Sequence, residues 1–105
     1  MPLEVVWSRF AETQLDKIFE YYTEEAGLLI ARKLLISIIL EADKLVEAPL
    51  IGQREEMLKD REIDYRYLLY KNYKLIYSVD HENHLIKIAD VFDTRQNPPK
   101  IKRGK

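Results

Sequence analysis

Thirteen residues at positions 65–77, YRYLLYKNYKLIY, constrain the fold of this chain more than any other stretch. Aromatic and aliphatic residues that favour strands lie on both sides of Lys71 and Asn72. Asn tolerates the left-handed backbone conformation that a two-residue hairpin turn requires. The segment therefore predicts a β-hairpin with strands over about 63–70 and 73–79.

The turn decides which residues of the two strands face each other. With residues 71 and 72 in the turn, 70 pairs with 73, 68 with 75 and 66 with 77. One face then carries Arg66, Leu68, Tyr70, Tyr73, Leu75 and Tyr77, and the other carries Tyr67, Leu69, Lys74 and Ile76. We expect one face to pack on helices, and the other to be an aromatic surface that bears a cation and is open to solvent or to a partner.

The segment before the hairpin predicts a short strand and two helices. Residues 3–7, LEVVW, favour a strand, and the residues after Ser8 have the spacing of an amphipathic helix that ends near Gly27. A second helix is predicted from about residue 28 to 47. Its apolar residues spread around the cylinder, so either its own chain encloses it or part of its surface contacts another chain.

The remaining pattern completes one α+β domain. A last strand is predicted over about 85–92, so the element order is β-α-α-β-β-β. We expect two antiparallel-packed N-terminal helices on one face of a mainly antiparallel four-stranded sheet. A single domain is expected over 1–99 with a basic C-terminal tail over 100–105, and Trp7 and Phe10 are expected in the core.

Charge is distributed unevenly along the chain, although the formal net charge is only −1. Residues 1–60 carry 7 Lys+Arg and 12 Asp+Glu, whereas residues 61–105 carry 10 and 6. The basic C-terminal part suits an acidic partner, or it is simply a solvated tail on a near-neutral protein.

Several classes of protein are excluded or disfavoured. The absence of cysteine excludes disulfides and thiolate metal sites and makes the reducing cytoplasm the default location. The N-terminus lacks the pattern of a signal peptide, and the longest apolar stretch, LLISIIL at 34–40, is too short to span a bilayer. His81 and His84 lie in or beside a predicted turn without an evident third ligand, so we expect surface residues, with no metal and no cofactor.

Several motifs, in their order and spacing, resemble one family. They are the W, A, L, I and YY pattern through the first helix, P..G after the second, YRYLLYKNYKLIYSV and ADVFDTRQNP. Together they resemble the RelE/ParE superfamily of bacterial toxins over about residues 3–99. The most specific parts are YKNYKLIY and VFDTRQNP, and the latter is closer to ParE-like than to RelE-like sequences.

The resemblance implies the toxin of a type II toxin–antitoxin pair. A small cognate antitoxin would neutralise it by wrapping a disordered segment around it, and the second helix would offer apolar surface for that contact. The candidate antitoxin contacts are Leu28, Leu35 and Ile39. The assembly expected is a heterotetramer with antitoxin or a toxin homodimer. RelE-like members cleave mRNA on the ribosome, whereas ParE-like members poison DNA gyrase.

Cleavage of RNA through its 2′-hydroxyl needs a base, an acid and cations that hold the pentavalent phosphate. Lys74 and Arg95 match basic positions of RelE-like enzymes. Tyr77 is a candidate acid, but an ordinary tyrosine pKa of about 10 makes a structural role the more natural one. No Tyr or His follows Arg95, where RelE-like enzymes place one.

The missing aromatic and the acidic N-terminal half favour the ParE-like interpretation, a gyrase inhibitor that is not a hydrolase. The candidate target contacts are Arg66, Lys74, Arg95, Lys100, Lys102 and Arg103. Simpler roles are open to two of them: Arg66 could pair with Asp64 or Asp90, and Arg95 could tie the tail to the sheet. Two alternatives stay open, a ribosome-dependent mRNA endoribonuclease and an inactive toxin that only binds within an autoregulatory complex.

Overall fold

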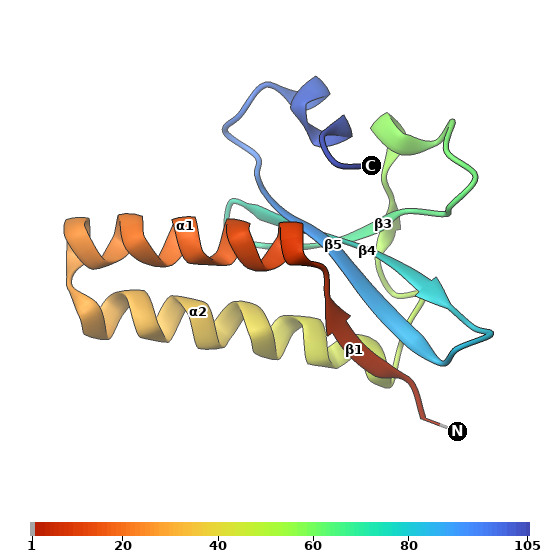
Figure 1. Ribbon diagram of the computed structural model, residues 1–105, viewed down its shortest axis with the longest axis horizontal. Coiled ribbons are helices and arrows are strands. Elements are labelled where there is room, and N and C mark those ends of the chain that lie inside the picture. The colour runs from red at the N-terminus through yellow and green to blue at the C-terminus, as the bar shows by residue number, and fades with distance from the viewer. Residues whose placement is uncertain (1) are drawn as a thin grey trace.

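The computed structural model describes residues 2–105 as five strands, two long helices and three short 3-10 turns (Figure 1). In chain order they are β1 Glu4–Trp7, α1 Arg9–Ala26, α2 Leu28–Asp43, η1 Lys44–Val46, β2 Gln53–Arg54, η2 Glu56–Leu58, β3 Arg66–Tyr70, β4 Tyr73–Asp80, β5 Leu85–Asp93 and η3 Pro98–Lys102. The predicted α+β architecture is confirmed. The second helix ends at Asp43, earlier than predicted, and continues as the short turn η1.

The sheet has the strand order β1-β5-β4-β3-β2, with β1 parallel to β5 and every other pair antiparallel. The predicted hairpin register is confirmed, because Tyr70 pairs with Tyr73 and Leu68 with Leu75. The prediction of four strands was wrong by one. The fifth, β2, lies in the charged connector, where two exposed polar residues pair with the start of β3 and leave no alternating apolar pattern to detect.

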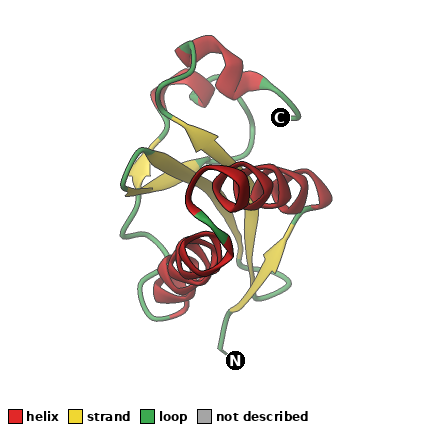
Figure 2. Ribbon diagram, turned by 90° about the vertical axis from the view of Figure 1, so that its left-hand side faces the viewer, coloured by secondary structure: helices red, strands yellow, loops and turns green. Residues whose placement is uncertain are grey.

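Two local devices place the helices. Ser8 caps α1, because its Oγ accepts a hydrogen bond from the Ala11 backbone N at 3.0 Å. Gly27 ends α1 and starts α2 with φ at 93°, a conformation that a side chain would strain. The helices therefore form a tight antiparallel hairpin, which Figure 2 shows nearly end-on.

The main core lies between this helical hairpin and one face of the sheet. Its fully buried members include Ile38 of α2, Leu75 and Tyr77 of β4, and Ile88 of β5. Trp7 and Phe10, both expected in the core, are only partly buried. Trp7 packs on the edge of the core, and Phe10 lies beneath the C-terminal residues.

The opposite face of the sheet, expected to be an open aromatic surface, is largely covered. Leu58 of η2 and Ile101 of η3 pack on Ile76 and Phe92 in a second, smaller core. Figure 1 shows η2 and η3 together on the side of the sheet away from the helices. The expectation failed because neither 3-10 turn carries a periodic apolar pattern, so nothing in the sequence indicated a covering layer.

The C-terminal residues, expected as a tail from residue 100, are tied to the sheet by a buried carboxylate. Asp90 is 0% exposed, and Arg103 holds it at 3.1 and 3.2 Å through Nη2 and Nε. Lys105 Nζ lies 2.8 Å from Asp90 Oδ2, and its side chain is itself buried, which lowers the pKa of Lys105. We call these three residues the C-terminal clasp.

A second tie joins the loop after α2 to β4. Tyr77 Oη donates to the Pro49 carbonyl O at 2.7 Å and accepts from the Gly52 backbone N at 3.0 Å. Burial raises the pKa of Tyr77. There is no room for a side chain at residue 52, because a Cβ there would lie 2.6 Å from Tyr77 Oη.

Replacing Gly52 with alanine should therefore destabilise the protein by about 1–3 kcal/mol, the usual cost of overpacking. Urea unfolding followed by circular dichroism measures the loss. In a Tyr77→Phe background the same change should cost less but not nothing, because the Tyr67 carbonyl O would still lie 2.7 Å away. A Gly52→Ala protein as stable as wild type would contradict the steric argument.

Asp90→Asn should weaken the C-terminal clasp and lower stability by about 2 kcal/mol. Breaking a buried ion pair typically costs about 3–5 kcal/mol, but here the released cations can swing out to water with the end of the chain. Hydrogen exchange should show faster amide exchange over residues 98–105. Lys102→Gln, at an exposed position of the same turn, is the matched control and should change neither quantity.

Candidate functional site

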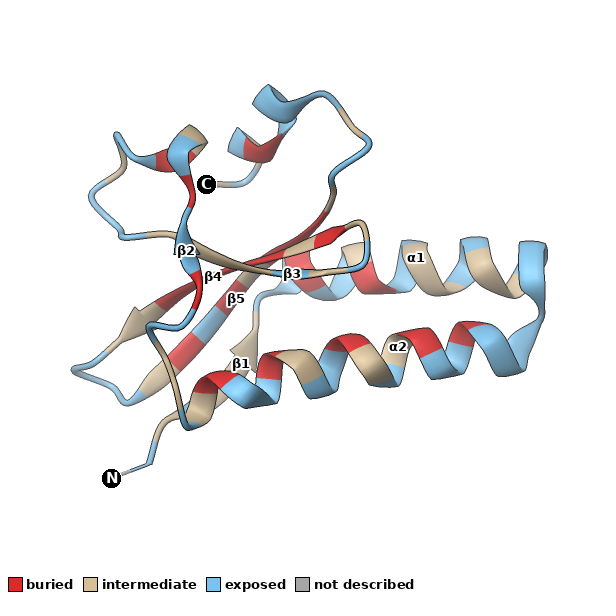
Figure 3. Ribbon diagram, turned by 180° about the vertical axis from the view of Figure 1, so that it is seen from behind, coloured by how far each residue is buried: buried red, intermediate tan, exposed pale blue. Residues whose placement is uncertain are grey.

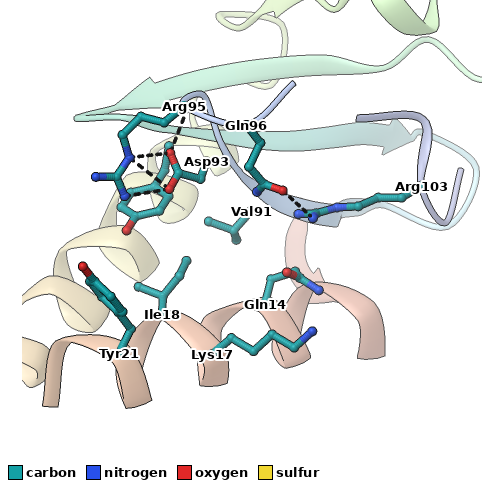
Figure 4. Close-up of a pocket in the computed structure, with 10 residues that line it drawn as sticks. Gln14, Lys17, Ile18, Tyr21, Val91, Asp93, Arg95, Gln96 and Arg103 are labelled. Atoms are coloured by element: carbon teal, nitrogen blue, oxygen red, sulfur yellow. Dashed lines mark hydrogen bonds and ion pairs between the residues drawn. The ribbon is translucent and has the colours of Figure 1, made fainter. Parts of the chain in front are cut away.

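A cleft of about 620 Å³ opens between α1 and the end of β5 (Figure 4). It is lined by Gln14, Lys17, Ile18, Tyr21, Tyr73, Val91, Asp93, Arg95, Gln96 and Arg103. Helical spacing brings the four α1 residues to one side, since positions 14, 17, 18 and 21 share a helix face. Strand alternation brings Val91 and Asp93 to the opposite side, where Tyr73 pairs with Asp93.

Arg95 is a cation of the cleft that is held in place by Asp93. Its Nη2 lies 2.7 Å from Asp93 Oδ2, and its Nε lies 3.0 and 3.1 Å from the two carboxylate oxygens. The hydrogen bond from Arg95 lowers the pKa of Asp93 to about 2, and Asn72 adds a further bond at 3.1 Å. The Arg95 side chain is still 62% exposed, so a fixed guanidinium faces solvent.

The other side of the cleft adds an unengaged cation and an aromatic ring. Lys17 of α1 has no ion-pair partner within residues 2–105, and Tyr21 is more than half exposed beside it. Ile18 and Val91 lie between the two sides, as Figure 4 shows. This arrangement suits an acidic group carried on an apolar segment of a partner.

Tyr73 lies in the same cleft but is poorly suited to proton transfer. Burial, and a side-chain hydrogen bond with Tyr22, raise its pKa. Its hydroxyl therefore stays protonated near neutral pH and can only donate or accept a hydrogen bond.

The structure does not bring Lys74 and Arg95 together, contrary to the expected joint site. Lys74 Nζ lies 2.7 Å from Oε1 of the buried Glu55 and 4.2 Å from the centre of the Tyr67 ring, on the face covered by η2 and η3. Arg95 lies on the helix side of the sheet. The charged connector that supplies Glu55 contains several acids, and nothing in the sequence singled out this one as the partner of Lys74.

The other predicted basic residues divide into two groups. Arg66 donates to the Gly52 carbonyl O at 3.0 Å and pairs with Asp64 at 3.2 Å, while Arg103 belongs to the C-terminal clasp. Lys100 and Lys102 are exposed on η3 and take part in no ion pair within residues 2–105. The sequence missed Lys17 and Tyr21, although their i, i+4 spacing on the polar side of α1 was a usable signal.

The second helix keeps a broad apolar surface open to solvent. We call it the outer α2 face, made of Leu28, Leu29, Leu35, Ile36, Ile39 and Leu40. All are exposed except Leu35, which is partly buried, and Leu40 is 58% exposed. Figure 3 shows exposed positions along the whole length of α2. The three candidate antitoxin contacts, Leu28, Leu35 and Ile39, all lie on this face.

The described part of the chain lacks two features. Residues 2–105 contain no group of three His, Cys, Asp or Glu side chains close enough to hold a metal ion. None of their helices combines the length and apolar character needed to cross a bilayer. His81 and His84 are exposed in the turn between β4 and β5.

Solved structures with this fold include two toxin–antitoxin assemblies. The chromosomal ParDE toxin–antitoxin system from P. aeruginosa matches with a TM-score of 0.71 and 19% identity over 87% of this chain and 95% of the matched chain. The RelBE2 toxin–antitoxin complex from Mycobacterium tuberculosis matches with a TM-score of 0.64 and 21% identity over 89% and 99%. No curated protein matches the sequence. The chain thus has the same fold as these two structures.

The match of the sequence to a family model is more specific than the match of the fold. The family model for the ParE toxin of the type II toxin–antitoxin system, parDE, matches residues 5–98. The chain therefore belongs to the ParE toxin family and is the toxin of a type II toxin–antitoxin system. The resemblance predicted from its motifs is confirmed.

The Arg95–Asp93 pair should make stability depend on pH. The Asp93 pKa is about 2 in the folded protein and 3.8 ordinarily, so the pair stabilises the fold above pH of about 4. That stabilisation is lost as the pH falls through about 2. Urea titrations from pH 5 to 2 should therefore show a steeper loss for wild type than for Asp93→Asn.

Asp80→Asn is the comparison variant for this measurement. Asn83 lowers the pKa of Asp80 to about 2 as well, but Asp80 ends β4 at the edge far from the cleft. Its replacement should also make the free energy of unfolding fall less steeply between pH 5 and 2, but it should not change ligand binding in the cleft. Parallel curves for wild type and Asp93→Asn would refute the role given to the pair.

Proposed function

We propose that this toxin acts by binding DNA gyrase, and that it does not cleave mRNA. The observation that carries the proposal is the separation of the three residues available for RNA cleavage. Tyr77 is buried in the main core, Lys74 lies under the second core, and Arg95 lies in the cleft beside α1. One phosphate cannot contact all three.

The chemistry of the individual groups supports the same conclusion. Both functions of the Tyr77 hydroxyl are occupied by Pro49 and Gly52, and its raised pKa makes it a poor acid. Lys74 is neutralised by Glu55 at 2.7 Å. Because the Lys74–Glu55 ion pair has almost no net charge, it would do little to stabilise a pentavalent phosphate.

The groups left free suit a protein contact. Lys100 and Lys102 are exposed on η3, whose C-cap residue Arg103 also lines the cleft that holds Arg95 and Lys17. Apart from Arg103, these four cations are proposed to form one basic side of the molecule. Arg66, Lys74 and Arg103 serve the fold in this proposal, although the sequence favoured them as target contacts. Charge on this side would steer the toxin to an acidic patch of its target.

The cognate antitoxin is proposed to cover the outer α2 face. The two solved structures named above are toxin–antitoxin complexes, and this face offers the apolar side chains that a folding-upon-binding segment needs. Leu28, Leu35 and Ile39 would then be buried in the complex. The antitoxin-binding and target-binding surfaces would then lie on different sides of one molecule.

Purified protein added to gyrase, ATP and relaxed plasmid should block supercoiling and accumulate linear, gyrase-cleaved DNA. Arg95→Glu with Lys17→Glu should raise the concentration needed at least tenfold, because two charges of the proposed contact are reversed. Lys44→Glu, a charge reversal on η1 at the end of α2 and away from the cleft and η3, is the matched control and should act like wild type.

A translation extract tests the competing activity on the same preparations. Fragmented mRNA, lost in Lys74→Met but kept in the cleft double variant, would overturn the gyrase proposal in favour of an endoribonuclease. A folded protein inert in both assays would favour the inactive binding module.

A further inference from the structure

The outer α2 face carries a symmetrical charge pattern in addition to its apolar residues. Its centre is formed by Leu35, Ile36, Ile39 and Leu40. Arg32 precedes this centre and Asp43 follows it. At 1.5 Å of rise per residue, both lie about 8 Å along the helix axis from the midpoint of the centre.

These two charges are not used inside the molecule. Arg32 and Asp43 are exposed, and neither has an ion-pair partner within residues 2–105. Helical geometry places both on the same side of α2 as Ile36 and Ile39, opposite the buried residue Ile38. The face is therefore apolar at its middle, positive towards its N-terminal end and negative towards its C-terminal end.

We propose that, without antitoxin, a second copy of this chain occupies the outer α2 face, with the two α2 helices antiparallel about a two-fold axis at their midpoint. In that arrangement Arg32 of each copy lies beside Asp43 of the other, which forms two equivalent ion pairs. Ile36 meets Ile39 of the second copy, and Leu35 meets Leu40. A two-fold interface requires this kind of self-complementary pattern.

Alternative orientations and occupants fit less well. Parallel helices would place Arg32 beside Arg32 and align the two helix dipoles unfavourably. A chain of unrelated sequence has no reason to match charges spaced symmetrically about the apolar centre, whereas a second copy matches them automatically. One helix face is smaller than the roughly 800 Å² per partner of a stable complex, so a micromolar dissociation constant is expected.

The inference concerns the isolated toxin and does not depend on how it acts on its target. It does imply competition, because the same face is the proposed antitoxin contact. A dimer would bury the exposed leucines and isoleucines until antitoxin replaces the second copy.

Sedimentation velocity of the purified full chain, from about 1 to 100 μM, tests the proposal. Wild type should shift from monomer to dimer over this range. Arg32→Asp and Asp43→Arg should each weaken dimerisation at least tenfold, because like charges then meet across the interface. The double variant, which restores both pairs with their signs exchanged, should recover dimerisation to within a few-fold of wild type.

Lys33→Asp is the matched control, with the same charge change one residue along α2, on the side that lines the cavity by Tyr70 and Lys71. It should dimerise like wild type, and circular dichroism should show every variant folded. The proposal is overturned if wild type stays monomeric at 100 μM, whether or not antitoxin binds the face. It is also overturned if folded Arg32→Asp dimerises normally, or if the folded double variant stays as weak as the single variants.

Discussion

The buried carboxylate of Asp90 is the interaction on which the second side of this protein depends. Two cations from the last three residues converge on it, and the same residues lie over the rings of Phe10 and Phe92. With the end of the chain held there, Ile101 is fixed against Leu58 and Phe92, and the face of the sheet that carries Lys74 is closed. Charge pairing at one point thus secures a hydrophobic layer too small to stabilise itself.

This closure separates two kinds of surface on one small domain. The side bounded by α1, β5 and η3 presents fixed cations, whereas the outer α2 face presents leucine and isoleucine. Two candidate catalytic residues of the sequence are engaged within the fold, since Lys74 bonds to Glu55 and Tyr77 accepts a bond from Gly52. The family shows that the chain is a toxin, and the placement of these groups supports the choice of a binding mechanism.

Much of the fold could be predicted because its signals are local. The hairpin register follows from the two-residue turn at Lys71 and Asn72, and the helix bounds follow from Ser8 and Gly27. The candidate site was harder, because its residues meet only through tertiary packing. Glu55 pairs with Lys74, and Arg103 pairs with Asp90, across long stretches of sequence, and no periodic pattern marks the turns that bring these pairs together. Arg95 was found from its motif, but its partner Asp93 and its neighbour Lys17 were not.

The parallel pairing of β1 with β5 has a consequence for how the protein folds during its synthesis. β1 leaves the ribosome well before β5, so this pair can form only after the helical hairpin and the intervening strands have been synthesised. Until then the helical hairpin, whose contacts are local, is the part able to form and to display its leucines and isoleucines. An antitoxin already present in the cell could thus bind the helical hairpin of a nascent toxin before the surface that contacts the target is complete.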